Sequence, residues 1–144
     1  MKKLLLLLII PLLSFGQSDS ISVLFLGNSY TSVNNLPNIV FNIASSMGDY
    51  LQVESNTMGG ATLQTHLNNN NSTVLIMEGV WDYVILQEQS QYPSFPLWQV
   101  EQDVFPYANQ LNQLIIDYND CGRTVFFMTW GRENGDSGNC ASWP

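Results

Sequence analysis

The chain has 144 residues, of which 45% are hydrophobic and 12% aromatic, so it can bury a sizeable core as one globular domain. It carries four Lys and Arg against twelve Asp and Glu, for a formal net charge of −8. Nucleic acids and anionic membrane surfaces bind basic patches, so this charge argues against both as partners. A neutral or polar small molecule, such as a carbohydrate ester, is compatible with it.

The N-terminus has the pattern of a secretory signal peptide. Lys2 and Lys3 precede an apolar run over residues 4–13, and small residues follow it. The run is shorter than the roughly 20 apolar residues that a membrane-spanning helix needs. We therefore expect residues 1–16 to be removed on export and residues 17–144 to form a secreted or periplasmic domain, without membrane contact after removal of the signal.

Four apolar runs predict β-strands, the second of them the weakest: residues 22–26, 51–56, 83–86 and 124–128. The other three are almost continuous in Val, Ile, Leu and Phe rather than alternating with polar residues. This pattern is typical of strands that are buried on both faces of a parallel sheet.

Helical patterns lie between the predicted strands. Apolar residues recur at helical spacing over residues 36–47, with Asn35 near the cap, Pro37 in the first turn and Gly48 at the end. A shorter helix fits residues 61–68. The asparagine tract at 68–71 that follows is predicted to be a solvated turn.

A second long apolar stripe runs over residues 97–118, and Pro106 is expected to kink or divide this helix. The aromatic side chains of Trp81 and Trp98 are expected to pack in the core or between helices. Strands that alternate with helices predict a three-layer α/β/α sandwich with a mainly parallel sheet.

Ligands of such sheets bind beyond the carboxyl ends of the strands. The segments expected there are polar, glycine-bearing or aromatic: residues 27–31, 58–61, 87–90 and 130–133. Serine-based acyl transfer needs an exposed hydroxyl, a general base and donors for the oxyanion. Ser29 follows the first strand, Gly60 can bring its backbone N–H close to a ligand, and Gln89 has a side-chain amide that can donate without adding charge.

These residues resemble the SGNH hydrolases, also called GDSL-type esterases and lipases. "GNSYT" is similar to the family's Gly-Asp-Ser block, which makes Ser29 the nucleophile and first oxyanion donor. "GGAT" is similar to the glycine block, with the Gly60 N–H as the second donor. "LQEQS" aligns with the Gly-x-Asn-Asp block and puts Gln89, longer by one methylene, at the position of the asparagine. Asn28 replaces the aspartate before the nucleophile, a residue that mainly holds the turn.

The resemblance covers roughly residues 21–133, but the family's Asp-x-x-His block is absent. His66 lies six residues beyond Gly60 on a predicted helix, about 9 Å along the axis and away from the strand ends. We therefore expect a polar helix residue there rather than a base. Either the protein lacks a base, or this chain is the front part of a longer one that supplies His and Asp; we expect the second.

Further substrate contacts are predicted for Asn28, Trp130 and Arg132. The ring of Trp130 suits a sugar ring, although core packing is an equal alternative. Arg132 and Glu133 either line the same cleft or pair with each other on the surface.

Cys121 and Cys140 flank the last predicted strand, so a disulfide needs the chain to double back, and both outcomes stay open. With one histidine and no C-x-x-C pair, neither a metal nor another cofactor is expected.

The sequence thus predicts a secreted serine esterase or acetylesterase that acts on an ester of a polar substrate such as a carbohydrate, through an acyl-enzyme on Ser29. On the resemblance, this chain by itself would be inactive or poorly active. The alternative is a non-catalytic exported module that binds glycans in the same strand-end cleft.

Overall fold

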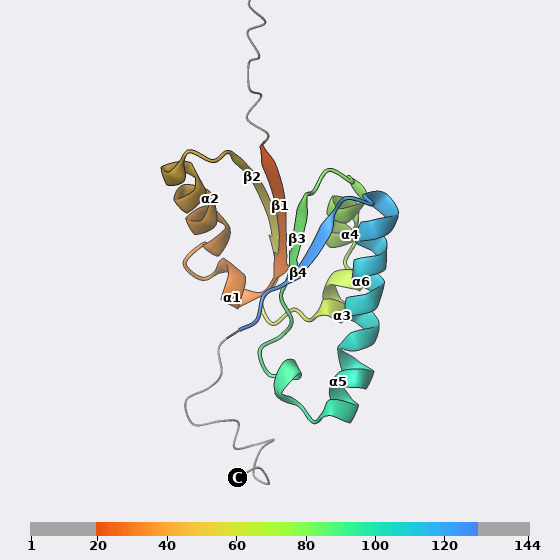
Figure 1. The fold of residues 1–144 in the computed structure, drawn as a ribbon. Coiled ribbons are helices and arrows are strands. Elements are labelled where there is room, and N and C mark those ends of the chain that lie inside the picture. Colours follow the sequence, from red (N-terminus) through yellow and green to blue (C-terminus); the bar gives the residue numbers. More distant parts are fainter. Residues whose placement is uncertain (1–19, 130–144) are drawn as a thin grey trace, which may run out of the picture.

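The computed structural model describes residues 20–129. Within them the chain forms an α/β fold around a four-stranded, all-parallel sheet with the order β2-β1-β3-β4 (Figure 1). The strands are β1 (Ile21–Gly27), β2 (Leu51–Thr57), β3 (Tyr83–Leu86) and β4 (Arg123–Phe126). All four predicted strands are confirmed, as is the parallel sheet.

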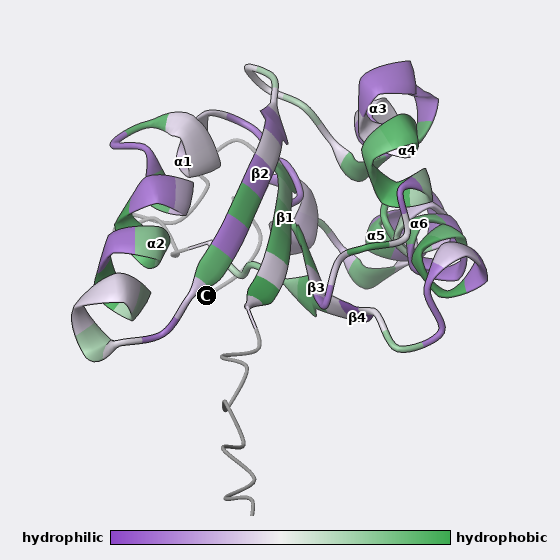
Figure 2. Cartoon of the chain, turned by 90° about the horizontal axis from the view of Figure 1, so that it is seen from above, coloured by the Kyte–Doolittle hydropathy of each residue, from purple (hydrophilic) through white to green (hydrophobic). Residues whose placement is uncertain are grey.

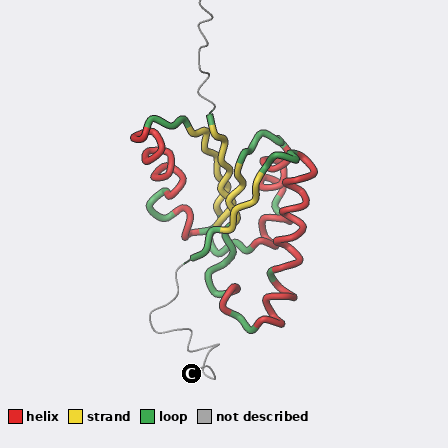
Figure 3. The backbone as a smooth tube through the Cα atoms, viewed as in Figure 1, coloured by secondary structure: helices red, strands yellow, loops and turns green. Residues whose placement is uncertain are grey.

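Helices cover both faces of the sheet, so the predicted three layers are confirmed (Figures 1 and 3). Helices α1 (Ser29–Ser32) and α2 (Leu36–Met47) lie on one face. The other face carries α3 (Leu63–Asn68), α4 (Asn70–Met77), α5 (Leu97–Asp103) and α6 (Phe105–Tyr118), with a short 3₁₀ helix, η1 (Tyr92–Ser94), before α5. No helix of residues 20–129 is long and apolar enough to cross a membrane.

The order in which the strands are added to the sheet reverses next to β1. From β1 the chain passes to β2 on one side, and β3 and β4 then follow on the other side. In register, Gly27 pairs with Thr57 and Leu26 pairs with Leu86. The loops after β1, β2 and β3 therefore leave the sheet at one edge, around the point where the strand order reverses. That edge is where open α/β sheets bind ligands.

Helix α2 begins and ends as the sequence predicts. Asn35 at its N-cap and Gly48 at its C-cap both have positive φ, 54° and 89°, and a proline stands in the first turn. Glycine adopts the left-handed conformation without a Cβ penalty, which explains why the helix stops at Gly48.

The prediction of a solvated turn at residues 68–71 is wrong. Asn69 is the N-cap of α4, and its side chain accepts a hydrogen bond of 3.0 Å from Ser72 N. Asparagine favours both turns and N-caps, because its side chain bonds to nearby backbone N–H groups. The helix that follows decides which of the two occurs.

The long apolar stripe is divided as expected. Helix α5 ends at Asp103, α6 begins at Phe105, and Pro106 lies in the first turn of α6, where its missing N–H costs nothing. Trp81 is 3% exposed, and its Nε1 donates to Leu75 O. The packing prediction is thus confirmed for Trp81 but wrong for Trp98, which is 66% exposed on α5.

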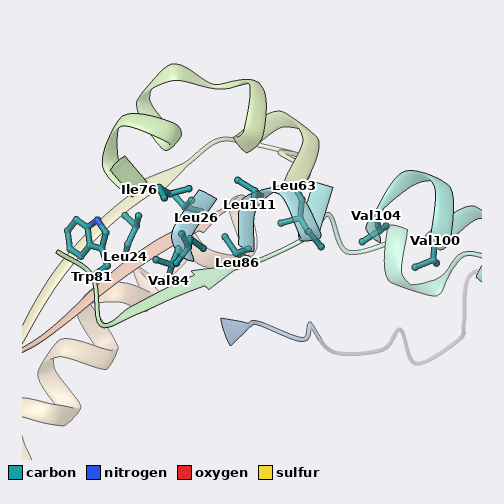
Figure 4. Packing of buried hydrophobic residues seen from close by; sticks show 12 residues of the cluster. Leu24, Leu26, Leu63, Ile76, Trp81, Val84, Leu86, Val100, Val104 and Leu111 are labelled. Atoms are coloured by element: carbon teal, nitrogen blue, oxygen red, sulfur yellow. The ribbon is translucent and has the colours of Figure 1, made fainter. Parts of the chain in front are cut away.

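The core lies between the sheet and helices α3 to α6 (Figure 4). The alternate residues Leu24 and Leu26 of β1 and Val84 and Leu86 of β3 point into it. The helices and the turn before β3 contribute the remaining members of this cluster: Leu63, Ile76, Trp81, Val100, Val104, Ala108, Leu111 and Ile115.

Burial on both faces holds for β1 but not for β4. Six of the seven residues of β1 are buried, whereas Val125 and Phe126 of β4 are 39% and 56% exposed. Among the described residues, β4 pairs only with β3, and α2 packs at the opposite edge, against β2. In Figure 2, β2 alternates between hydrophilic and hydrophobic residues, as expected of a strand with one covered face.

Candidate active site

Ser29 is exposed at the carboxyl end of the central strand. It is the first residue of α1, and the preceding Asn28 is the N-cap, whose Oδ1 accepts a hydrogen bond of 3.1 Å from Tyr30 N. The residue borders a cavity of about 470 Å³ lined by Ser29, Tyr30, Val33, Asn34, Leu36, Ile39 and Phe127. A largely apolar cavity with the hydroxyl-bearing residues Ser29 and Tyr30 in its wall can hold a small acyl group or the face of a ring.

Asn28 ties the turn of Ser29 to the loops after β2 and β3. Its backbone N donates to Gln87 Oε1 at 2.9 Å, and its Nδ2 donates to Ala61 O at 2.9 Å. Its Oδ1 accepts from Gln87 Nε2 at 2.9 Å. The side chain is buried, and these partners account for the turn-holding role expected from sequence. A direct contact of Asn28 with substrate stays a prediction with no observation in its favour.

Gln87 is the functional-site residue that the sequence reasoning missed. Its Oε1 accepts from Asn28 N and from Thr31 Oγ1, both at 2.9 Å. Its Nε2 donates to Asn28 Oδ1 and, at 2.6 Å, to Glu88 O. The side chain is buried and makes four hydrogen bonds, so it crosslinks the ends of β1 and β3. The sequence signal for this role of Gln87 is an amide side chain directly after a buried strand, because a buried amide group needs hydrogen-bond partners.

Gly27 has no room for a side chain. A Cβ at this position would meet Thr31 Oγ1 and would lie 2.8 Å from Gln87 Oε1. The glycine in "GNS" is therefore explained by the close approach of the Thr31–Gln87 hydrogen bond to the strand end.

Gly60 lies in an exposed turn. The next residue, Ala61, connects this turn to Asn28, because its carbonyl oxygen accepts a hydrogen bond from Asn28 Nδ2. Gly60 has a φ of 71°, and Ala61 N closes the turn by donating to Met58 O at 3.0 Å. The positive φ explains the glycine. The hydrogen bond from Asn28 to Ala61 O brings the loop of Gly60 beside the turn of Ser29, as the sequence predicts for a shared site. The role of the Gly60 N–H as an oxyanion donor stays a prediction.

Gln89 is half-buried, and its Oε1 accepts a hydrogen bond of 2.7 Å from Gln91 N. The side chain thus caps its own loop. This leaves the Nε2 group as the part of Gln89 that can serve as a donor. The predicted oxyanion role depends on that group alone and stays a prediction.

Glu88 is a buried carboxyl in the same loop. Both of its oxygens lie 3.3 Å from Leu63 N, the first N–H of α3, and its Oε1 accepts from Gln89 N at 2.6 Å. Burial raises the pKa of Glu88, and these backbone hydrogen bonds offset part of the effect. Glu88 therefore holds the start of α3 against the loop after β3.

His66 is fully buried behind the strand end. Its Nε2 lies 3.0 Å from Gly27 O and its Nδ1 lies 2.8 Å from Ser72 Oγ. A carbonyl only accepts, so Nε2 carries a proton, and in the neutral ring Nδ1 then accepts from the serine hydroxyl. Burial lowers the pKa of His66. The expectation of a polar helix residue rather than a base agrees with the position of His66 in α3 and with these contacts. The expectation that it lies away from the strand ends is wrong, because α3 packs behind β1 and His66 bonds to Gly27, the last residue of that strand.

Several predicted residues lie outside the described part of the chain: Trp130, Arg132, Glu133, Cys140 and the signal peptide at 1–16. Cys121 is exposed in the turn before β4. No three His, Cys, Asp or Glu side chains between residues 20 and 129 are grouped so that they could hold a metal ion.

The chain matches no protein-family model and no curated protein sequence. The geometry of the strand-end site and the short sequence blocks that it contains are therefore the features that point to a function.

Proposed function

We propose that the domain is an ester hydrolase of the SGNH type that forms an acyl-enzyme on Ser29. The observation that carries the proposal is the position of Ser29, exposed beside a 470 Å³ cavity on a turn clamped by Asn28 to the two neighbouring strand ends. A nucleophile must be held rigidly while its hydroxyl stays accessible. The buried Asn28–Gln87 pair provides the first condition, and the exposed site of Ser29 the second.

In the proposed reaction, Ser29 Oγ attacks the ester carbonyl carbon and its proton passes to a base. The tetrahedral oxyanion is bound by the backbone N–H groups of Ser29 and Gly60 and by Gln89 Nε2. The alcohol leaves with a proton, and water then hydrolyses the acyl-enzyme to release the acid.

The base is not His66, because both of its ring nitrogens are bonded inside the protein. His66 is the single histidine of the printed sequence. The family resemblance implies a base and an orienting acid from an Asp-x-x-His block, which the printed sequence does not contain. We therefore expect the 144-residue chain to hydrolyse esters slowly unless a base is added.

The substrate that fits best is a neutral ester with a small acyl group, such as an acetylated carbohydrate. The cavity beside Ser29 is bounded largely by apolar side chains, among them Val33, Leu36, Ile39 and Phe127, and no charged residue of the described part of the chain lines it. The chain's net charge of −8 disfavours anionic substrates. Export of the protein is part of this proposal and depends on the sequence pattern of residues 1–16 alone.

The experiment is hydrolysis of p-nitrophenyl acetate with and without imidazole, which can replace a missing base. The native chain is expected to gain activity with imidazole beyond the imidazole background, and the peptide that contains Ser29 should carry an acetyl group by mass spectrometry. Ser29→Ala should abolish both. Ser32→Ala is the matched control, because Ser32 is an exposed serine at the other end of α1. Equal rates for the native chain and Ser29→Ala would reject the proposal.

A second candidate is a non-catalytic module that binds glycans in the strand-end cleft. The burial of His66 favours it, since among residues 20–129 no histidine faces Ser29. This candidate predicts glycan binding that survives Ser29→Ala, together with no imidazole-dependent turnover.

A further inference from the structure

We propose that a second cavity, between the carboxyl ends of β3 and β4 and helix α5, binds a neutral apolar molecule that carries a hydroxyl group. Binding there involves no reaction at Ser29, so this proposal is independent of the proposed ester hydrolysis.

The cavity has a volume of about 860 Å³, within the range of small-molecule sites. Its wall comes from α3, β3, the segment around η1, α5, the start of α6 and the end of β4 with the residues that follow. The lining residues are predominantly apolar: Leu63, Leu86, Glu88, Pro93, Ser94, Phe95, Pro96, Leu97, Val100, Val104, Phe105, Phe126, Phe127, Met128 and Thr129.

The cavity adjoins one end of the main core. In Figure 4, Leu63 lies near the end of the row of packed core residues, and Val104 and Val100 continue beyond it. Leu63, Val100 and Val104 all line the cavity. The large side chains of Leu97, Phe126 and Met128 in its wall stay exposed. Covering them with an apolar ligand gains roughly 25 cal/mol for each Å² removed from water.

The charges of the lining limit which ligand can bind. Among the described residues of the wall, Glu88 is the only ionisable one, and none of them is a Lys or Arg that could pair with an anionic ligand. A fatty-acid carboxylate would therefore be buried next to a carboxyl group without a counter-charge, which is costly. A neutral ligand avoids this cost.

Glu88 also explains why the ligand should carry a hydroxyl. Its oxygens accept from Leu63 N and Gln89 N, but a carboxylate has about four acceptor positions, so capacity for one more donor remains. The hydroxyls of Ser94 and Thr129 lie in the same wall. Phe127 lines this cavity and the cavity of Ser29, so the bound molecule would lie next to the candidate active site.

The test uses the neutral fluorescent probe N-phenyl-1-naphthylamine and its displacement by 1-decanol or by decanoate near pH 7. The native chain should bind the probe at one site. Decanol should displace it, and decanoate should need at least about tenfold higher concentration, given the cost of burying an unpaired charge. Glu88→Gln removes the carboxyl and should reduce that difference.

Leu97→Glu should abolish probe binding by placing a charge in the wall. Trp98→Glu is the matched control, because both residues belong to α5 and are 66% exposed, yet only Leu97 lines the cavity. Circular dichroism should show that both variants fold. Ile43→Glu on α2, at the far face, should leave binding unchanged.

Three results would overturn the proposal. In the first, the native chain binds no probe, as expected if its own residues or a second copy fill the cavity. Sedimentation of the native chain and of Leu97→Glu distinguishes these two occupants, because only a second copy makes the native chain a dimer that the variant disrupts. In the second, decanoate competes as well as decanol. In the third, probe binding is lost in Ile43→Glu and kept in Leu97→Glu, which would place the site on α2.

Discussion

Asn28 and Gln87 exchange two hydrogen bonds across the carboxyl ends of β1 and β3. The backbone N of Asn28 donates to Gln87 Oε1, and Gln87 Nε2 donates to Asn28 Oδ1, each at 2.9 Å. Both residues are buried, so these bonds form where water does not compete for the same groups. The two residues are 59 apart in the sequence, and together they fix the turn that presents Ser29.

The first prediction concerns this pair. Gln87→Met keeps the length of the side chain but removes the partners of Asn28 N and Thr31 Oγ1 and one of the two donors to Asn28 Oδ1, which keeps its bond from Tyr30 N. Since each buried polar group left unpaired costs about 1–3 kcal/mol, the free energy of unfolding should fall by at least about 2 kcal/mol. Urea denaturation measures it. Gln89→Met is the control in the same loop, with a loss of less than about 1 kcal/mol expected for its single bond to Gln91 N. Equal losses in the two variants would contradict the crosslinking role of Gln87.

The second prediction concerns Gly27. In Gly27→Ala the new Cβ would displace Thr31 Oγ1 and Gln87 Oε1 from their hydrogen bond. A loss of about 1–3 kcal/mol in the free energy of unfolding is expected, as for other overpacked sites. Gly59→Ala is the control, because a Cβ there meets no atom within 4 Å. A Gly27→Ala variant as stable as Gly59→Ala would show that the strand end tolerates a side chain.

The third prediction concerns the pH dependence that His66 causes. Its pKa is lowered from 6.5 by burial, so the unfolded chain binds the proton more readily than the folded one. The stability contribution is fully present above pH 6.5 and is lost as the pH falls toward the folded pKa. The stability difference between the native chain and His66→Gln should therefore shrink as the pH falls below 6.5. Urea denaturation over this range measures it, and a constant difference would contradict burial of the neutral ring.

The fourth prediction concerns Glu88 and has the opposite sign. Burial raises its pKa above 4.5, so its contribution to stability is fully present below pH 4.5 and is lost as the pH rises through the folded pKa. Glu88→Gln does not titrate. Its stability relative to the native chain should therefore increase as the pH rises above 4.5, in thermal or urea denaturation at matched pH values. A relative stability that does not change with pH would show that the carboxyl is well solvated.

Much of the fold follows from local sequence. The strand at 83–86 and the helix at 36–47 have the predicted bounds, because uninterrupted apolar runs, prolines and cap residues act over a few neighbours. The prediction was wrong for the asparagine tract, where the same residue type suits a turn or a cap, and for Trp98, whose exposure depends on how α5 packs.

The candidate site, too, was predicted in part from the sequence and decided in part by the tertiary structure. The sequence by itself determined the parallel α/β sheet and placed Ser29 directly after its first strand, because both depend on the order of apolar and polar segments. Only the tertiary structure decided the roles of Gln87 and His66. Each is a single polar residue whose partners, Asn28 for Gln87 and Gly27 for His66, lie dozens of residues away. Hydrogen bonds over such separations leave no local pattern, and folding alone brings their donors and acceptors together.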